Sequence, residues 1–285
     1  MNKQENFSKT EKFIANKILE NKVNWKTTSA RTIASQLFIA PSTLSRFCQK
    51  AGYKGFIDFR VSLLKELDYI ENQEKDINPN LPFEYVDNAF EISKKIEQLY
   101  TNTVRNTYSL LKTIDLEKVS SYINKYNTIC LFSLGNTGPL YNFEKKMIRI
   151  GKQVLVTQAA DDVFYYGNYH SEDWLFILVS YSGETPSMLR VASFLKQRGA
   201  STLGISSFGD NSLESIVSYS LRLATGENLR DNFGDFSVNI SENYIFDVLY
   251  SLCFSKNFVK NYHNKVDIAR EYEKKRISNN KLLKD

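Results

Sequence analysis

The sequence predicts two domains of different class: a small all-α domain, followed by an α/β domain built on a doubly wound parallel sheet. Up to about residue 72, short helical patterns follow one another with no strand pattern between them, whereas after residue 127 short apolar runs alternate with helical stretches. Such alternation is typical of parallel βαβ units. The chain has 285 residues, of which 42% are hydrophobic, which is enough for two unequal domains with a sizeable core.

Four helices are predicted in the first domain, over residues 8–22, 29–37, 41–51 and 56–72. Ser8 and Glu11 form a capping-box pattern at the start of the first helix, ahead of an apolar stripe with helical spacing. Pro41 stands at the favoured first position of the third helix. The following residues, 71–82, are polar and contain two prolines, which predicts a linker.

At the start of the second domain, a helical pattern extends over residues 83–126. Five strands are then predicted, over residues 128–134, 153–157, 174–180, 201–206 and 219–224. Helices are predicted between and after them, over residues 138–151, 161–169, 185–198, 212–217 and 236–260. The apolar run WLFILV in the third strand is typical of a central strand buried on both faces.

These patterns place four segments along the chain. We expect the first domain over residues 1–75, a linker and helix over 76–109, the α/β domain over 110–260, and a charged tail over 261–285.

The positive charge is confined to the first domain. Residues 8–65 contain eleven Lys/Arg and three Asp/Glu, and the net charge of +5 arises within residues 1–75, since the remaining residues balance. A basic domain attached to a neutral one suggests an anionic partner for the first domain. The alternative is a solvated lysine-rich surface.

Several classes of protein are excluded by what the sequence lacks. No stretch approaches the ~20 apolar residues of a membrane helix, and the amino-terminal residues resemble no signal peptide, so we expect a cytoplasmic protein without membrane contact. Three cysteines far apart predict neither disulfides nor a zinc site. The absence of GxxxxGK[ST] and of GxGxxG argues against an NTPase and a dinucleotide fold. We therefore expect no metal and no cofactor.

The second and third helices could read DNA, because two short helices joined by a tight turn can place the second in a major groove. Apolar residues at helical spacing supply a buried seam between them. The polar positions facing outward are Ser42, Thr43, Ser45, Arg46, Gln49 and Lys50, and Arg31 and Lys54 are candidate contacts to the DNA backbone. These hydroxyls, amides and cations are groups that donate to phosphates and base edges. The alternative is an ordinary three-helix bundle with a basic face.

The string ARTIASQLFIAPSTLSRFCQKAGYKGFIDFRVSLLKEL resembles the winged-helix-like head of RpiR-type bacterial regulators, and RFCQKAGYKGF is its most specific part. Phe38 stands where such turns often carry glycine, and Ala40 stands where the reading helix usually has a serine cap. The resemblance implies that operator DNA is the partner of this domain.

Hydroxyls and glycines follow three of the predicted strands, in SLGNTG (133–138), SYSGET (180–185) and SSFGD (206–210). Ligands of open parallel sheets bind at the carboxyl ends of the strands, where backbone N–H groups, helix N-termini and hydroxyls hold anions. The alternative is that these turns only cap helices.

SYSGET matches the SxSGxT signature of sugar isomerase (SIS) domains, and the resemblance covers residues 115–255. It implies a flavodoxin-like fold that binds the phosphate of a phosphosugar. Carried over, the contacts are Asn136, Thr137, Ser180, Ser182 and Thr185, with Gly183 allowing close backbone approach. The first loop departs from the family pattern, with Ser133 at the first glycine position.

An isomerase needs a general base near the sugar. Glu184, Glu242, Asp161 and His170 are available, and Glu242 is the best candidate because the closing helix approaches the ligand. SIS domains fused to RpiR-type heads sense ligands rather than convert them, so the resemblance implies no catalytic residues.

Together these features predict a transcription regulator whose SIS domain senses a phosphosugar and modulates binding to double-stranded operator DNA. A homodimer or homotetramer is expected, because SIS domains pair through their helices and a symmetric reader needs two half-sites. The alternatives are a phosphosugar isomerase with an accessory basic domain, and a non-catalytic binding protein that acts on a protein partner.

Overall fold

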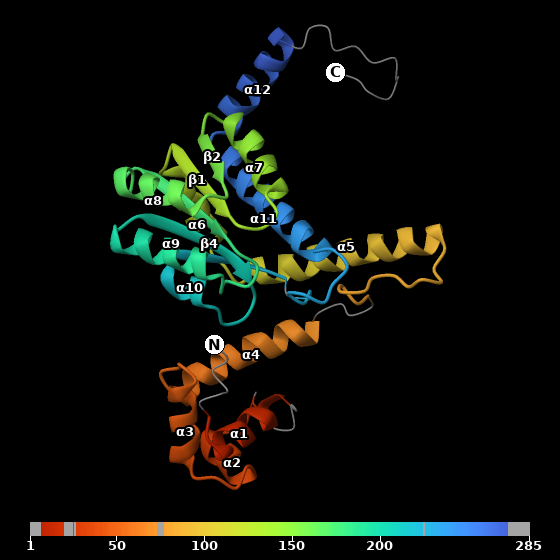
Figure 1. Ribbon diagram of the computed structural model, residues 1–285, viewed down its shortest axis with the longest axis vertical. Coiled ribbons are helices and arrows are strands. Elements are labelled where there is room, and N and C mark those ends of the chain that lie inside the picture. The colour runs from red at the N-terminus through yellow and green to blue at the C-terminus, as the bar shows by residue number, and fades with distance from the viewer. Residues whose placement is uncertain (1–6, 20–24, 26, 73–76, 225, 273–285) are drawn as a thin grey trace. The chain divides into compact units, whose positions relative to one another are not determined.

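The computed structural model describes residues 7–19, 25, 27–72, 77–224 and 226–272. The chain divides into two compact units, residues 1–73 and 74–285. Figure 1 shows the helices and strands of both units.

The first unit is all-α, as the sequence predicted. Its helices are α1 Lys9–Leu19, α2 Ala30–Gln36, α3 Pro41–Lys50 and α4 Phe56–Asn72. One apolar cluster joins the helices, and Ile14, Ile33 and Leu44 in it are fully buried. The Trp25 ring meets Phe59 edge-on, with ring centroids 6.1 Å apart. Aromatic and aliphatic burial thus gives this small unit its own core.

The turn between α2 and α3 keeps the geometry that usually needs glycine. Phe38 adopts a left-handed backbone, with φ of 55°, and its side chain is 95% exposed. The backbone N–H of Ile39 donates to the Ala34 carbonyl over 2.9 Å, which closes the turn. Phenylalanine therefore occupies a conformation that costs a non-glycine residue roughly 1–2 kcal/mol.

The second unit contains a five-stranded, all-parallel sheet in the order β2-β1-β3-β4-β5. The strands are β1 Thr128–Ser133, β2 Gln153–Thr157, β3 Trp174–Val179, β4 Ser201–Ser207 and β5 Tyr219–Leu223. This is the flavodoxin-like order, so the predicted doubly wound sheet is confirmed.

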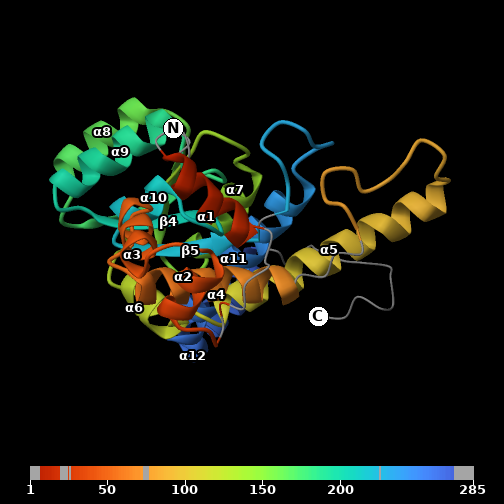
Figure 2. The same ribbon diagram turned by 90° about the horizontal axis from the view of Figure 1, so that it is seen from below.

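Helices cover both faces of the sheet (Figures 1 and 2). One layer consists of α5 Ala89–Leu111, α6 Leu116–Asn124, α7 Gly138–Ile148 and α11 Phe236–Ser255, and the other of α8 Ala160–Tyr169, α9 Pro186–Gln197 and α10 Ser212–Ile216. Alternate residues of a strand point to opposite faces. Accordingly, Ile129 and Leu131 pack in the first layer, and Cys130 and Phe132 in the second.

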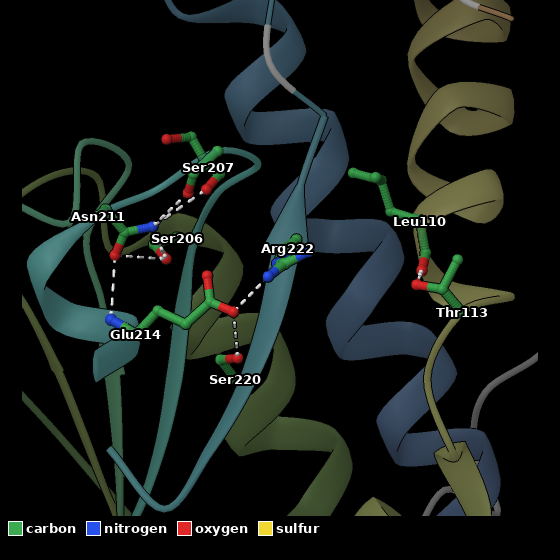
Figure 3. Close-up of polar contacts among 9 residues, drawn as sticks. Leu110, Thr113, Ser206, Ser207, Asn211, Glu214, Ser220 and Arg222 are labelled. Carbon is green, nitrogen blue, oxygen red and sulfur yellow. Dashed lines mark hydrogen bonds and ion pairs between the residues drawn. The ribbon is translucent and has the colours of Figure 1, made fainter. Parts of the chain in front are cut away.

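Two predicted helices are divided in the structure. The segment predicted as helical over 83–126 contains two helices, α5 and α6. Asn88 begins α5 with a capping box, and the Asp115 side chain caps α6 by accepting from the Lys118 N–H. The Thr113 hydroxyl donates to the carbonyl of Leu110 in the last turn of α5, over 2.8 Å (Figure 3). Side-chain caps of this kind end one helix and start another.

The end predicted for the closing helix, 236–260, was wrong. It ends at Ser255, and a further helix, α12 Phe258–Tyr272, follows. The Asn261 side chain donates to the Phe254 carbonyl over 3.0 Å, which satisfies an orphan acceptor at the end of α11. Part of the segment expected as a charged tail is therefore helical, and residues 273–285 lie outside the described residues.

Candidate functional sites

A pocket of about 340 Å³ lies at the carboxyl ends of β1 and β3. It is lined by the loops that follow these two strands, by Asn228 and Leu229, and by the first two turns of α11. This is the position at which an open parallel sheet binds its ligands.

Three serine and threonine residues of the SYSGET loop line this pocket, Ser180, Ser182 and Thr185, and Tyr181 of the same loop lines it as well. Ser180 and Thr185 lie 3.4 Å apart through their hydroxyl oxygens. Thr185 is the residue before the first turn of α9, and its side chain makes no capping bond. The first N–H groups of α9 and these hydroxyls therefore form a set of neutral donors suited to an anion.

The SLGNTG loop contributes Asn136 and Ser133 to the pocket. Asn136 accepts from the Gly138 N–H over 2.9 Å and donates to the Asn239 side chain over 2.7 Å, which ties the loop to α11. Thr137 is placed differently from its sequence expectation. It is the residue before α7 and is not among the residues that line the pocket.

Gly183 does not line the pocket either, and its close backbone approach is to Asn211. A Cβ on Gly183 would lie 2.3 Å from Asn211 Oδ1, and the glycine has a φ of +63°. The glycine of the SxSGxT signature is therefore required at this position because a side chain would collide with the neighbouring loop.

The third hydroxyl-rich loop, SSFGD, does not line the pocket. It supports the SYSGET loop, because the Ser207 N–H donates to the Tyr181 carbonyl over 2.8 Å. The Asn211 amide donates to Ser206 Oγ over 3.1 Å and to the Ser207 carbonyl over 3.3 Å, and its oxygen accepts from the Glu214 N–H (Figure 3). Asn211 thus braces the loop after β4 and the start of α10.

Glu184 holds the SYSGET loop from outside the pocket. Its carboxylate accepts from the Ser212 backbone N–H over 2.7 Å and from the Ser212 hydroxyl over 2.8 Å. Two hydrogen bonds to one carboxylate give it the role of orienting the loop.

Glu242 lies inside the pocket, unlike the other candidate bases. It is 5% exposed, and its Oε2 has no hydrogen-bond partner. Burial, with a smaller contribution from Asp235, raises the pKa of Glu242 to about 8. Glu242 therefore holds a proton at neutral pH and can donate to a bound hydroxyl or carbonyl.

Asp161 and His170 lie on and next to α8, away from the pocket lining. The His170 ring stacks on Trp174 with ring centroids 4.2 Å apart, and its Nδ1 lies 3.4 Å from the Asp173 carboxylate. These contacts give His170 a packing role.

Glu227 fixes the start of α11, the helix that lines the pocket, and no sequence pattern predicted this role. It is 5% exposed, and its carboxylate accepts from the backbone N–H groups of Ser237 and Val238 at the start of α11. Burial raises its pKa. A capping carboxylate normally stands at the helix start, whereas Glu227 is ten positions before Ser237, so no local sequence pattern reveals its capping role.

The outward face of α3 is polar, as its helical spacing predicts. Ser42, Arg46, Gln49 and Lys50 are exposed, Thr43 and Ser45 are half-buried, and Arg31 and Lys54 outside this helix are exposed. The opposite face, with Leu44, Phe47 and Cys48, is buried.

Two cations on this face have partners within the domain. Lys50 Nζ forms an ion pair with Glu11 Oε2 at 2.8 Å, and Arg46 Nε donates to the Ser42 carbonyl over 3.3 Å. An approaching phosphate would compete with the Glu11 carboxylate for Lys50.

Residues 1–69 match the model of the helix-turn-helix domain of the rpiR family, and residues 141–250 match the model of the SIS domain. The chain therefore combines a helix-turn-helix domain of the rpiR family with a SIS domain. An uncharacterized HTH-type transcriptional regulator of Haemophilus influenzae is 28% identical over 254 residues, which cover 87% of this chain and 86% of the relative. A second such regulator, of Providencia stuartii, is 23% identical, and the match covers 85% of this chain and 84% of the relative.

Two solved structures share the fold of this chain. The Vibrio vulnificus NanR protein complexed with ManNAc-6P has a TM-score of 0.60 and 19% identity, and the match covers 97% of both chains. A putative sugar-phosphate isomerase of Listeria monocytogenes has a TM-score of 0.52 and 16% identity, and the match covers 66% of this chain and 99% of that chain. The α/β fold therefore occurs in proteins named for different functions.

Within the part of the chain that the structure describes, no helix is long and apolar enough to span a bilayer. The same residues contain no group of three potential metal ligands.

Proposed function

We propose that this protein is a cytoplasmic transcription regulator of the RpiR type, whose SIS domain binds a phosphosugar and thereby changes operator binding by the helix-turn-helix domain. The observation that carries the proposal is the meeting of three loop hydroxyls with the N-terminus of α9 in one pocket. That arrangement suits a phosphate, because donors and a helix dipole converge without a cation.

The phosphate end of the ligand is assigned to Ser180, Ser182 and Thr185. Among the described residues that line the pocket there is no lysine or arginine, so hydroxyls and N–H groups would carry the binding of a dianion. Charge-assisted hydrogen bonds of this kind are roughly twice as strong as neutral ones.

The sugar end is assigned to the start of α11. Asn239 and Glu242 stand on the same face of this helix, three residues apart, and both line the pocket. An amide and a protonated carboxyl can both donate and accept, which suits the hydroxyls of a sugar.

The DNA-binding role is assigned to α3, whose exposed Gln49 and Arg46 would face a major groove. A symmetric operator would require at least a homodimer, or a homotetramer, with self-association through residues 83–285. Several aromatic side chains of this region are exposed, among them Phe258 and Tyr262 of α12, and they could be buried between copies.

The proposal is tested with the purified full chain. Thermal shifts are measured with ManNAc-6P, glucose 6-phosphate and inorganic phosphate, and an operator is selected from random duplexes by binding. We expect at least one phosphosugar to raise the melting temperature and to change the dissociation constant for the operator. A chain that selects no DNA sequence, or an operator affinity that no bound phosphosugar alters, would contradict the proposal.

A second candidate function, phosphosugar isomerase, is favoured by one observation, the buried and unpartnered Oε2 of Glu242. A general base for proton transfer between sugar carbons needs a pKa near the working pH. Incubation of the protein with hexose and pentose phosphates, followed by chromatography of the sugars, distinguishes the two functions. Turnover that Glu242→Gln abolishes would establish the enzyme.

A further inference from the structure

A surface segment between β5 and α11 forms one wall of the pocket. This segment, residues 226–235, is here called the strap. Asn228, Leu229 and Asp235 of the strap line the pocket. The Leu229 side chain is 68% exposed and so contributes little to holding the strap in place.

The strap is fixed to the pocket loop through Glu227. The Tyr181 hydroxyl, in the SYSGET loop, donates to the Glu227 carbonyl over 2.8 Å. The Glu227 carboxylate also binds the first N–H groups of α11, as described above. A ligand that shifts Tyr181 or the start of α11 therefore acts directly on the strap.

The two neighbours of Glu227 are both bound by Asn80. Asn80 Nδ2 donates to the Gly226 carbonyl over 3.1 Å, and Asn80 Oδ1 accepts from the Asn228 N–H over 2.6 Å. One amide side chain thus spans three consecutive strap residues, whose middle member is bound by the pocket loop.

Further contacts hold the same two segments together. The Phe233 N–H donates to the Asn80 carbonyl over 2.9 Å, and the Phe83 and Phe233 rings lie 5.2 Å apart. The Asn78 side-chain oxygen accepts from the Asn80 N–H over 3.0 Å and from its amide over 3.2 Å, which fixes the orientation of Asn80. We call residues 77–83 and these contacts the clamp.

The clamp has a particular place in the chain. Asn80 is 146 residues from Gly226, and it lies in the polar segment 71–82 that follows the last helix of the helix-turn-helix domain. The residues that hold the strap are therefore part of the connection between the DNA-binding domain and the SIS domain.

We propose that Asn80 is a positioning residue that holds the strap against the phosphosugar pocket and couples occupation of the pocket to the interdomain linker. The proposal rests on the proposed function. If a ligand moves the strap, the Asn80 bonds break or the linker follows. By linkage, a state of the linker that favours DNA binding must change ligand affinity by the same factor.

The clamp itself is tested by hydrogen exchange without ligand. Asn80→Ala removes two bonds to the strap, and Phe83→Leu removes the aromatic contact without touching the amide. The matched control is Asn264→Ala, at an exposed position of α12. In Asn80→Ala we expect the amides of Asn228 and Phe233 to exchange about tenfold faster, because the lost bonds hold the strap closed. Unchanged exchange in both Asn80→Ala and Phe83→Leu overturns the clamp.

The coupling is tested by the ratio of operator dissociation constants with and without ManNAc-6P, in wild type and the three variants. Coupling ratios of this kind are typically about 5–150-fold. In Asn80→Ala we expect the ratio to approach one while the ligand-free operator affinity stays as in the control, a pattern that general destabilisation does not produce. A variant with faster strap exchange and an unchanged ratio overturns the coupling role.

The two hypotheses fail in different ways. A wild-type protein that binds neither ManNAc-6P nor glucose 6-phosphate contradicts the proposed function, and the exchange measurement still decides whether Asn80 holds the strap. If ManNAc-6P changes the operator dissociation constant of the wild type, and changes it by the same factor in both clamp variants, the proposed function stands and the coupling is overturned.

Discussion

Gly183 and Asn211 approach each other so closely that a Cβ on Gly183 would lie 2.3 Å from Asn211 Oδ1. The contact joins the loop that carries the pocket hydroxyls to the residue that caps α10. Because Gly183 also has a φ of +63°, both the space and the backbone conformation at this position exclude a side chain.

Gly183→Ala is therefore expected to destabilise the protein by more than the roughly 1–2 kcal/mol that a left-handed backbone costs an alanine. It should also displace the Ser182 hydroxyl and weaken phosphosugar binding. The matched control is Gly199→Ala, since Gly199 has a φ of +71° and a Cβ added there would meet no atom within 4 Å. Equal losses of unfolding free energy in the two variants, measured in urea, would show that the contact with Asn211 is unimportant.

Ser182→Ala is expected to weaken phosphosugar binding while the fold survives. Ser182 lines the pocket, and its Oγ accepts from the Glu184 N–H over 3.1 Å. Loss of one charge-assisted hydrogen bond should cost roughly 1.5–3 kcal/mol of binding free energy. Calorimetric titration measures it, with Ser251→Ala on the exposed side of α11 as the control. An affinity equal to that of the control would remove Ser182 from the site.

Glu242→Gln is expected to change how stability depends on pH. The pKa of Glu242 is about 8 in the folded protein, against an ordinary value of 4.5, so between these values the folded protein holds a proton that the unfolded chain releases. The free energy of unfolding should therefore fall as pH rises through this window, by up to about 1.4 kcal/mol per pH unit. Glutamine has no proton to lose.

Denaturant titrations at pH 5, 6, 7 and 8 measure this difference. The variant should become more stable relative to wild type as pH rises. Glu227, whose pKa burial also raises, contributes a dependence of the same sign in both proteins and cancels in the comparison. Parallel stability curves would place the carboxyl of Glu242 in a solvated environment.

Three substitutions in the first domain separate base reading from phosphate contacts. Gln49→Ala should cost roughly 1–3 kcal/mol on the true operator and little on scrambled DNA, if Gln49 reads a base edge. Lys50→Ala should weaken binding to both DNAs and lower the salt slope by about one unit. Glu11→Gln should strengthen binding to both, because it releases Lys50 from the ion pair at 2.8 Å.

Binding titrations at several salt concentrations measure these effects. If neither Gln49→Ala nor Lys50→Ala alters affinity on either DNA, α3 does not read DNA.

Ala40→Ser is expected to stabilise the first domain. Ala40 precedes α3 and makes no side-chain capping bond, whereas Ser29 caps α2 by accepting from the Thr32 N–H. A serine cap contributes roughly 0.5–2 kcal/mol. Ser29→Ala should lower stability by a similar amount, and thermal unfolding of the two variants checks both signs. A loss of stability in Ala40→Ser would mean that Pro41 already supplies the helix start.

Local patterns were sufficient for the class and order of the domains. WLFILV predicted a central strand, and β3 is buried between β1 and β4 because a run without polar residues can only lie between two covered faces. Likewise, the α3 seam and its polar face follow from helical spacing alone. Helix ends were less predictable, because a cap such as Asn261 on Phe254 depends on how two segments pack.

The candidate site divides in the same way. The sequence by itself determined that hydroxyl-rich loops follow β1 and β3, since strand ends and a short signature are local features. Only the tertiary structure decided that SSFGD bonds to the SYSGET loop, that Glu227 caps α11, and that Asn80 bonds to the strap. These relationships join residues up to 148 positions apart, and a single polar residue leaves no periodic trace in the sequence from which its partner could be found.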